Sequence, residues 1–219
     1  AVATIVLDHS ECASVFQHRG IDFCCRGAMS LEEACREKGL DAKGVMLELD
    51  RAIAQRRGAT EVDARTMTTS ELVDHIVSRH HTYLRGALPF VQPLADKVAR
   101  VHGEHNPELI LLAGVVAKLV GALEPHLETE EKILFPALRC EPVPRDVVLR
   151  EFAAMHEDHL AVGRLLAEMR SASEDFHVPE WGCNSYRTLF SELEKLEVDI
   201  LRHVHLENHV LMPRFTTAL

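Results

Sequence analysis

The sequence predicts an all-α protein, an antiparallel four-helix bundle preceded by a small helical domain that contains cysteines. Four long stretches repeat apolar residues at three- and four-residue spacing, which puts those side chains on one face of a helix. The connections between the stretches are short except for the last, residues 172–183. Short connections are typical of antiparallel neighbours in a bundle.

The composition is ordinary for a globular protein and argues against some classes of function. Of 219 residues, 47% are hydrophobic and 26% charged, and the formal net charge is −10. Nucleic acids and anionic membranes select cationic surfaces, so we expect neither as a partner. No continuous apolar run is long enough to span a membrane, for which about 20 residues are needed. The chain is large enough to bury a core without disulfides, so its cysteines indicate a reducing, cytoplasmic setting.

Residues 1–60 are predicted to form the small helical domain. The first helix runs from about Thr4 to His18, with Gly20 at the position of a left-handed cap. A loop with two adjacent cysteines follows, at residues 21–27.

Two further helices complete the predicted N-terminal domain. Ser30 and Glu33 form a capping box for a helix that ends near Gly39. Asp41 caps the third helix, which is expected to reach about Arg57.

The polar stretch Gly58–Thr69 is the predicted linker to a bundle domain, residues 69–219. Pro89 and Pro93 are expected to kink the first bundle helix. The four bundle helices are predicted at about Ser70–His102, Pro107–Arg139, Pro144–Ser173 and, after Asn184, to Phe215.

The core-facing stripe of each long helix is apolar except at one or two positions, which hold histidine or glutamate. The stripes also place Val77 of the first helix and Ile133 of the second in the core. The ionisable residues in the stripes are His81, His126, Glu130, His159, His203 and Glu207.

Two of the helices carry the same motif, H-x-x-x-E-x-x-x-L-[FM]-P, at residues 126–136 and 203–213. Residues four apart lie on one face of a helix, so each copy presents an imidazole beside a carboxylate. A buried carboxylate without a counter-charge costs several kcal/mol. Two metal cations would remove this cost, and the sequence therefore predicts a two-metal site in the bundle.

The spacing of these residues indicates a duplicated helical hairpin. His81 and His159 are 78 residues apart (159 − 81), and His126 and His203 are 77 apart (203 − 126). Each half then contributes one lone histidine and one histidine–glutamate pair.

Two positions have a competing histidine. His80 lies on a row nearly as apolar as that of His81, and both stay open with His81 favoured. His156 competes with His159, and the repeat spacing favours His159.

Other polar residues near the motifs are expected outside the core. His205 and His209 fall off the stripe of the fourth helix and are expected at the surface. Glu131 lies about 100° round the helix from Glu130 and is expected at the rim of the site. Mixed imidazole and carboxylate ligation suits iron and argues against a closed structural zinc site, while manganese stays an alternative.

The combination of motifs resembles the Repair of Iron Centres proteins, hemerythrin-like di-iron proteins of bacteria. The resemblance covers nearly the whole chain and differs at Arg26 and Met212, where the family often has Gly and Phe. It rests on the adjacent Cys24 and Cys25 with Gly27, on His81, on both H-x-x-x-E motifs, on His159 followed by Gly163, and on Asn208 and Arg214.

The resemblance implies a cytoplasmic protein that restores iron–sulfur clusters damaged by nitric oxide or oxidative stress. It implies two non-haem iron ions bridged by carboxylates and an oxo or hydroxo group, held by the six residues of the stripes. Iron donation, nitric oxide binding and nitric oxide reduction are all compatible mechanisms, so enzymatic activity stays open. Expected partners are damaged iron–sulfur proteins, nitric oxide or another diatomic, and a second copy of the chain in a homodimer.

Cys24 and Cys25 are predicted to have a redox or metal-transfer role, with packing as the alternative. They lie in a loop, and the neighbouring Arg26 is expected to favour the thiolate. Adjacent cysteines rarely form a disulfide with each other, because the ring is strained.

Three other functions remain as alternatives. A hemerythrin-type carrier or sensor of oxygen or nitric oxide would use more histidines, including an H-x-x-x-H pair, whereas both pairs here are H-x-x-x-E. A ferritin-like oxidase would use E-x-x-H, which the stripes lack. A metal-independent interaction module would fold fully without metal.

Overall fold

The protein is helical throughout the residues that the structure, a computed structural model, describes: 1–55 and 63–216. No strand occurs in these two ranges, which confirms the predicted all-α fold. The predicted end of the third helix at Arg57 and the first residues of the predicted linker, from Gly58, lie outside the described residues. The chain divides into two compact units, residues 69–200 and residues 1–68 with 201–219. The predicted domains, 1–60 and 69–219, stay a prediction.

The N-terminal region begins with two short helices where the sequence predicts one. His9, with φ −141° and ψ 84°, leaves the helical conformation and separates them. A continuous helix would spread the four polar residues at 8–11 around most of its circumference, including its buried face. The helices are α1 (Val2–Asp8), α2 (Cys12–His18), α3 (Leu31–Lys38) and α4 (Ala42–Ala54).

The predicted caps of this region are confirmed. Gly20 and Gly39 have φ angles of 63° and 66°, in the left-handed region that favours glycine. Ser30 and Glu33 form a capping box at the start of α3. The Asp41 carboxylate accepts hydrogen bonds from the first backbone N–H groups of α4.

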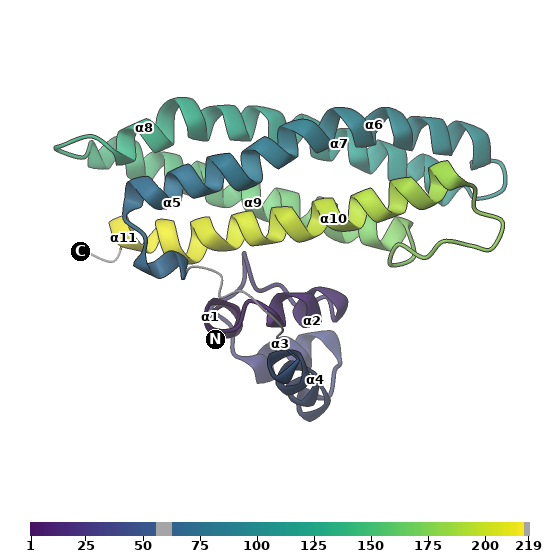
Figure 1. Cartoon of the computed structure of the whole chain (residues 1–219), viewed down its shortest axis with the longest axis horizontal. Coiled ribbons are helices and arrows are strands. Elements are labelled where there is room, and N and C mark those ends of the chain that lie inside the picture. The colour runs from purple at the N-terminus through teal and green to yellow at the C-terminus, as the bar shows by residue number, and fades with distance from the viewer. Residues whose placement is uncertain (56–62, 217–219) are drawn as a thin grey trace. The chain divides into compact units, whose positions relative to one another are not determined.

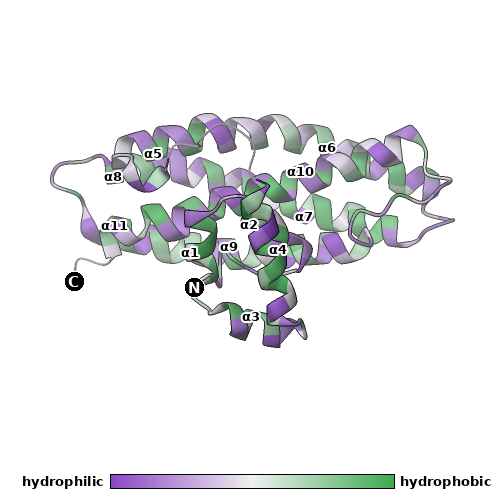
Figure 2. Ribbon diagram, turned by 60° about the horizontal axis from the view of Figure 1, so that its bottom comes forward, coloured by the Kyte–Doolittle hydropathy of each residue, from purple (hydrophilic) through white to green (hydrophobic). Residues whose placement is uncertain are grey.

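Four long helical runs form the predicted bundle and lie side by side in Figure 1. Apolar and polar residues alternate along these helices (Figure 2), as expected for helices that bury one face. After a short 3₁₀ turn, η1 (Ala64–Thr66), the runs are α5 (Thr69–Ile76), η2 (Val77–His81) and α6 (Thr82–His102); α7 (Glu108–Thr129), η3 (Glu130–Leu134) and α8 (Phe135–Leu138); α9 (Arg145–Ala172); and α10 (Asn184–Leu206), η4 (Glu207–Leu211) and α11 (Pro213–Thr216).

Three of the runs contain a single π-helical turn, at η2, η3 and η4. In η3 and η4 the turn ends two residues before a proline, Pro136 or Pro213. Proline has no N–H and its ring clashes with the carbonyl one turn earlier, so a wider turn before it relieves the helix. The N–H of Phe135 bonds the carbonyl of Glu130, and the N–H of Met212 bonds that of Glu207. The proline that ends each motif therefore accounts for the wide turn that begins at each glutamate.

The extra residue of a π turn shifts the core-facing stripe. The predictions that Ile133 and Val77 lie in the core were therefore wrong. Ile133 is 45% exposed, and Leu134 takes its place at 1%. Val77 is half-buried, while Ile76 before it is fully buried. An uninterrupted 3.6-residue period cannot anticipate this shift of about 100°.

Helix α6 stays helical from Thr82 to His102 through both Pro89 and Pro93. A π turn interrupts the first run at η2, where the hydroxyl of Thr82 donates to the carbonyl of Val77 over 3.1 Å, and the kink at the prolines stays a prediction.

The stretch Glu108–Leu138 is long and apolar enough to cross a membrane by length and composition. The sequence analysis did not expect such a helix. A core helix passes the same test, and α7 buries Leu112, Leu119 and Leu123 in the bundle. We therefore interpret this stretch as a core helix.

One buried carboxylate of the bundle is neutralised by an arginine. Glu197 of α10 is 4% exposed and accepts two hydrogen bonds from Arg170 of α9, one of them 3.0 Å long. Arg170 also pairs with Asp175 at 3.2 Å. The arginine guanidinium, which donates two parallel hydrogen bonds, is the usual protein partner of a buried carboxylate.

Replacing Arg170 with Met should lower the free energy of unfolding by about 3–5 kcal/mol, because it leaves Glu197 buried without its partner. The double variant R170M/E197L should recover most of that loss, since two apolar side chains carry no uncompensated charge. Urea unfolding of both variants and the wild type measures the difference. A single variant as stable as the wild type would show that Glu197 is hydrated or neutral.

Candidate metal centre

The structure brings the six predicted ligands together in two overlapping groups. Each group holds two histidines and two glutamates, and its ligand atoms lie within 4.8 Å of one another. All six side chains are at most 5% exposed. Glu130 and Glu207 belong to both groups, which is the composition of a two-metal site with shared carboxylates. One group is His81, Glu130, His203 and Glu207; the other is His126, Glu130, His159 and Glu207.

Glu130 faces a different histidine with each of its carboxylate oxygens. Its Oε1 lies 3.3 Å from Nε2 of His126, and its Oε2 lies 3.4 Å from Nε2 of His81. Glu207 has Oε1 at 2.9 Å from Nε2 of His203. A carboxylate that presents its two oxygens to two sets of nitrogens has the geometry of a bridge between two ions.

The separation of the imidazoles also fits a cation. Nε2 of His126 lies 3.3 Å from Nε2 of His159. Two nitrogens that each lie about 2.1 Å from one ion are about 3 Å apart when they subtend roughly a right angle. The donor set, made only of imidazole and carboxylate, suits iron or manganese and excludes an all-thiolate structural site.

Two further carboxylates hold the outer nitrogens of these histidines. Nδ1 of His81 lies 2.8 Å from Oε1 of Glu131, and Nδ1 of His126 lies 3.2 Å from Oδ2 of Asp158. When Nδ1–H donates to a carboxylate, the Nε2 lone pair is directed at the metal position. Glu131 was expected at the rim of the site, and no role was predicted for Asp158. The position of Asp158 directly before His159 was the only indication of its role in the sequence.

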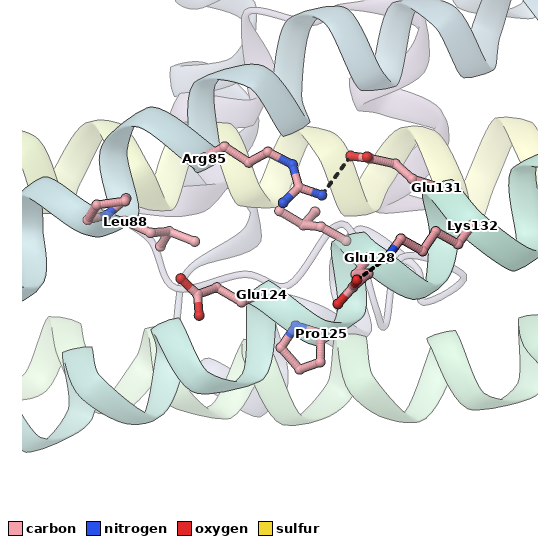
Figure 3. Close-up of a pocket in the computed structure, with 9 residues that line it drawn as sticks. Arg85, Leu88, Glu124, Pro125, Glu128, Glu131 and Lys132 are labelled. Carbon is pink, nitrogen blue, oxygen red and sulfur yellow. Dashed lines mark hydrogen bonds and ion pairs between the residues drawn. The ribbon is translucent and has the colours of Figure 1, made fainter.

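Glu131 also belongs to a surface pocket of about 620 Å³ between α6 and α7 (Figure 3). Arg85 donates to Oε1 of Glu131 over 3.1 Å, and Lys132 pairs with Glu128 nearby. Burial raises the pKa of Glu131, but the hydrogen bonds from His81 and Arg85 outweigh it and hold that pKa below its usual value. Glu131 therefore stays a carboxylate that both orients His81 and reaches the surface.

The competing histidines lie outside the two groups. His80 is 5% exposed, so His80 and His81 are both buried. Nδ1 of His80 lies 3.0 Å from Oδ1 of Asp199. His156 is half-buried. The structure places His81 and His159 with the glutamates; that the six residues bind metal stays a prediction.

His205 and His209 were expected at the surface, and the structure contradicts this. His205 is 4% exposed, and its Nδ1 lies 3.2 Å from the carbonyl of Phe23. Nε2 of His209 lies 2.8 Å from the carbonyl of Cys24, and that ring is half-buried. Residues 201–219 and 1–68 form one compact unit, so N-terminal residues cover the helix face that the periodicity assigned to solvent. Burial, with a contribution from His209, lowers the pKa of His205 to about 4.

The adjacent cysteines are free thiols in a loop that Asp22 organises. Oδ1 of Asp22 accepts hydrogen bonds from the backbone N–H of Cys24 over 3.0 Å and of Cys25 over 2.8 Å. The two Sγ atoms are 3.6 Å apart, with Cys24 buried and Cys25 half-buried.

The expected effect of Arg26 on the Cys24 thiol was wrong. Its guanidinium pairs with Glu37 at 2.7 Å, and both side chains are about half exposed. The hydrogen bond with Cys25, followed by burial, raises the pKa of Cys24 well above its usual value. Cys24 is therefore a thiol until a cation or another partner replaces its proton.

Comparison with known families matches two parts of the chain. Residues 72–215 match the Hemerythrin HHE cation binding domain, and residues 1–53 match a Domain of Unknown function, DUF542. The first match contains all six candidate ligands, and the second contains both adjacent cysteines.

Similar proteins extend over nearly the whole chain. The iron-sulfur cluster repair protein ScdA of Staphylococcus haemolyticus is 32% identical over 98% of this chain and 97% of its own length. The iron-sulfur cluster repair protein YtfE of Yersinia pseudotuberculosis is 30% identical over 93% of this chain and 90% of its own. A probable iron-sulfur cluster repair protein of Haemophilus influenzae is 28% identical over 91% and 89%.

Replacing Glu131 with Gln should weaken ferrous iron binding by about 10–100-fold, because an amide orients and polarises the His81 ring less well than a carboxylate. Titration against a competing chelator measures the affinity. Glu128→Gln is the matched control, since Glu128 lines the same pocket but pairs with Lys132. Equal affinities in the two variants would show that Glu131 does not act through His81.

Proposed function

This chain belongs to the iron-sulfur cluster repair proteins that carry a hemerythrin HHE cation-binding domain, and from that we propose that it holds two non-haem iron ions and helps restore iron–sulfur clusters damaged by nitric oxide or oxidative stress. The observation that carries the proposal is the pair of oxygens of Glu130, each directed at a different histidine.

Each side chain of the centre has a distinct part in this proposal. Glu130 and Glu207, which belong to both groups, would be shared by the two ions, and the four histidines would complete the two ligand sets. Glu131 and Asp158 fix the ring orientation and tautomer of His81 and His126. Bound ferrous iron would supply electrons and open coordination positions to a diatomic such as nitric oxide, together with iron that a carboxylate–imidazole site releases more readily than a thiolate site.

The protein's part in repair takes one of three forms within this proposal. Iron is donated to the damaged cluster, nitric oxide is bound and removed, or nitric oxide is reduced in a reductase-type reaction. Cys24 and Cys25 serve in redox or metal transfer. The setting is the cytoplasm, the protein partners are damaged iron–sulfur proteins, and a homodimer is the proposed assembly.

A hemerythrin-type carrier or sensor is the second candidate. The match of residues 72–215 to the hemerythrin domain favours it, because that match covers the centre and not the cysteine loop. Reversible oxygenation of the reduced protein, followed by absorption spectroscopy, would support the carrier. Rapid oxidation by oxygen together with tight nitric oxide binding would support the repair protein.

Replacing Glu130 or Glu207 with Ala should abolish stoichiometric iron binding, because it removes a ligand shared by both groups. The helical content should stay near that of the wild type, since each change deletes a buried carboxylate that is costly without a cation. Metal analysis after anaerobic purification and circular dichroism measure the two quantities. Glu128→Ala, a change at the surface, is the control. Two irons per chain in either variant would contradict the bridging role.

Replacing both Cys24 and Cys25 with Ser should spare iron binding at the histidine–glutamate centre and impair cluster repair. The assay is reactivation of a nitric oxide-damaged iron–sulfur enzyme by the purified iron-loaded protein. The matched control is the C140S/C183S variant, which removes two exposed thiols. Full repair by the C24S/C25S variant would assign the pair to packing.

A further inference from the structure

A second group of metal-binding side chains lies in the N-terminal loop, outside the histidine–glutamate centre. The carboxylate of Asp22 and the thiols of Cys24 and Cys25 have ligand atoms within 4.8 Å of one another. We propose that these three residues form a mononuclear site for a thiophilic divalent cation. This inference rests on the transfer role proposed for the cysteines, and it names Asp22 as the third ligand and ferrous iron as the ion carried.

The spacing of the two sulfurs fits a single ion. Two thiolates that each lie about 2.3 Å from a tetrahedral cation are about 3.7 Å apart. The Sγ atoms of Cys24 and Cys25 are 3.6 Å apart. Occupation by a cation therefore requires the loss of two thiol protons to solvent and almost no movement of the sulfurs.

The backbone of the loop is held in place from several directions. The Cys24 carbonyl accepts a hydrogen bond from the side-chain amide of Asn208 over 3.0 Å and lies 2.8 Å from Nε2 of His209. Nδ1 of His205 lies 3.2 Å from the Phe23 carbonyl. These three side chains fix the segment that carries the thiols, so the ligand geometry is formed before the cation arrives.

Gly27 closes the same loop and leaves no room for a side chain. A Cβ at this position would lie 2.4 Å from the Phe23 carbonyl oxygen and 2.7 Å from Nε2 of His209. The close approach of Gly27 to the Phe23 carbonyl and the His209 ring thus requires glycine. A thiol pair that needed only to be mobile and reactive would not require this packing.

The donor set is that of a transfer site rather than a closed structural one. Structural zinc-type sites have four protein ligands, whereas this site supplies three and leaves a fourth position for an incoming ligand. Cys24 is buried and Cys25 is half-buried, so Cys25 is the more accessible of the two sulfurs to an incoming ligand. A cysteine of an acceptor protein displaces Cys25 by thiolate exchange, the cation keeps its charge, and no electron is transferred.

Cobalt(II) is the probe that reports this site directly. The full chain is first loaded with only two equivalents of Fe²⁺, which the six-residue histidine–glutamate centre should take up first, and is then titrated with Co²⁺ without oxygen. One further equivalent should bind, with thiolate-to-cobalt charge-transfer absorption. The C25S variant should lose that absorption, and C140S and C183S, which remove exposed thiols, should retain it.

Asp22→Asn tests the third ligand without dismantling the loop. The amide oxygen can still accept the backbone hydrogen bonds, but it is a weaker donor to a cation. Co²⁺ affinity should fall by about tenfold or more while charge-transfer absorption persists at saturation. An unchanged affinity would remove Asp22 from the ligand set.

Protection of the thiols from alkylation distinguishes Fe²⁺ from Zn²⁺. It is measured on the wild-type protein, so it does not depend on whether a variant folds. Fe²⁺ should protect Cys24 and Cys25 of the wild-type protein, as read by mass spectrometry, and leave Cys140 reactive. Protection by Zn²⁺ alone would overturn the assignment to iron, and protection by neither ion would overturn the site. Iron content of the histidine–glutamate centre, measured in the same samples, shows separately whether the proposed function fails.

Discussion

The central constraint on this fold is the burial of two carboxylates, Glu130 and Glu207, at the middle of a helical bundle. The protein buries a third, Glu197, and neutralises it with the guanidinium of Arg170. Glu130 and Glu207 instead lie among imidazoles, with His81 and His126 beside Glu130 and His203 beside Glu207. Neutral imidazoles offset little negative charge, but they are metal ligands, so the arrangement is stable when cations join them. The donor set therefore fits the two-metal centre proposed for this bundle.

The local sequence sets the geometry of this centre through proline. Each H-x-x-x-E motif ends in a proline, and the wide turn before Pro136 or Pro213 begins at the glutamate itself. Before the glutamate the α-helix is regular, so histidine and glutamate stay four residues apart on one face. The π turn shifts the core-facing stripe only after the glutamate. The motif thus encodes both the ligands and the point at which the helix adjusts around them, a recurrent use of π turns at functional sites.

Much of the fold and all six residues of the centre could be predicted, because burying ionisable groups in apolar stripes is costly enough to be visible in one sequence. The errors have identifiable causes. Ile133 was placed in the core because a regular period cannot register the π turn. His205 was placed in solvent because helical periodicity does not reveal a second layer of covering residues, here the N-terminal segment. Asp158 was missed, and Glu131 was placed at the rim without a role, because groups that support ligands are partly exposed and resemble ordinary surface acids.

One helical segment connects the two kinds of site. On one face, residues 203–207 present His203 and Glu207 to the histidine–glutamate centre, and the next residues, Asn208 and His209, hold the Cys24 carbonyl. The π turn η4 starts at Glu207, so the helix face that the residues present changes between Glu207 and the following residues that hold the thiol loop. A shift of Glu207 would be transmitted to Asn208 within the same turn. Two candidate ligands and the residues that hold the thiol loop thus lie on one continuous helical segment.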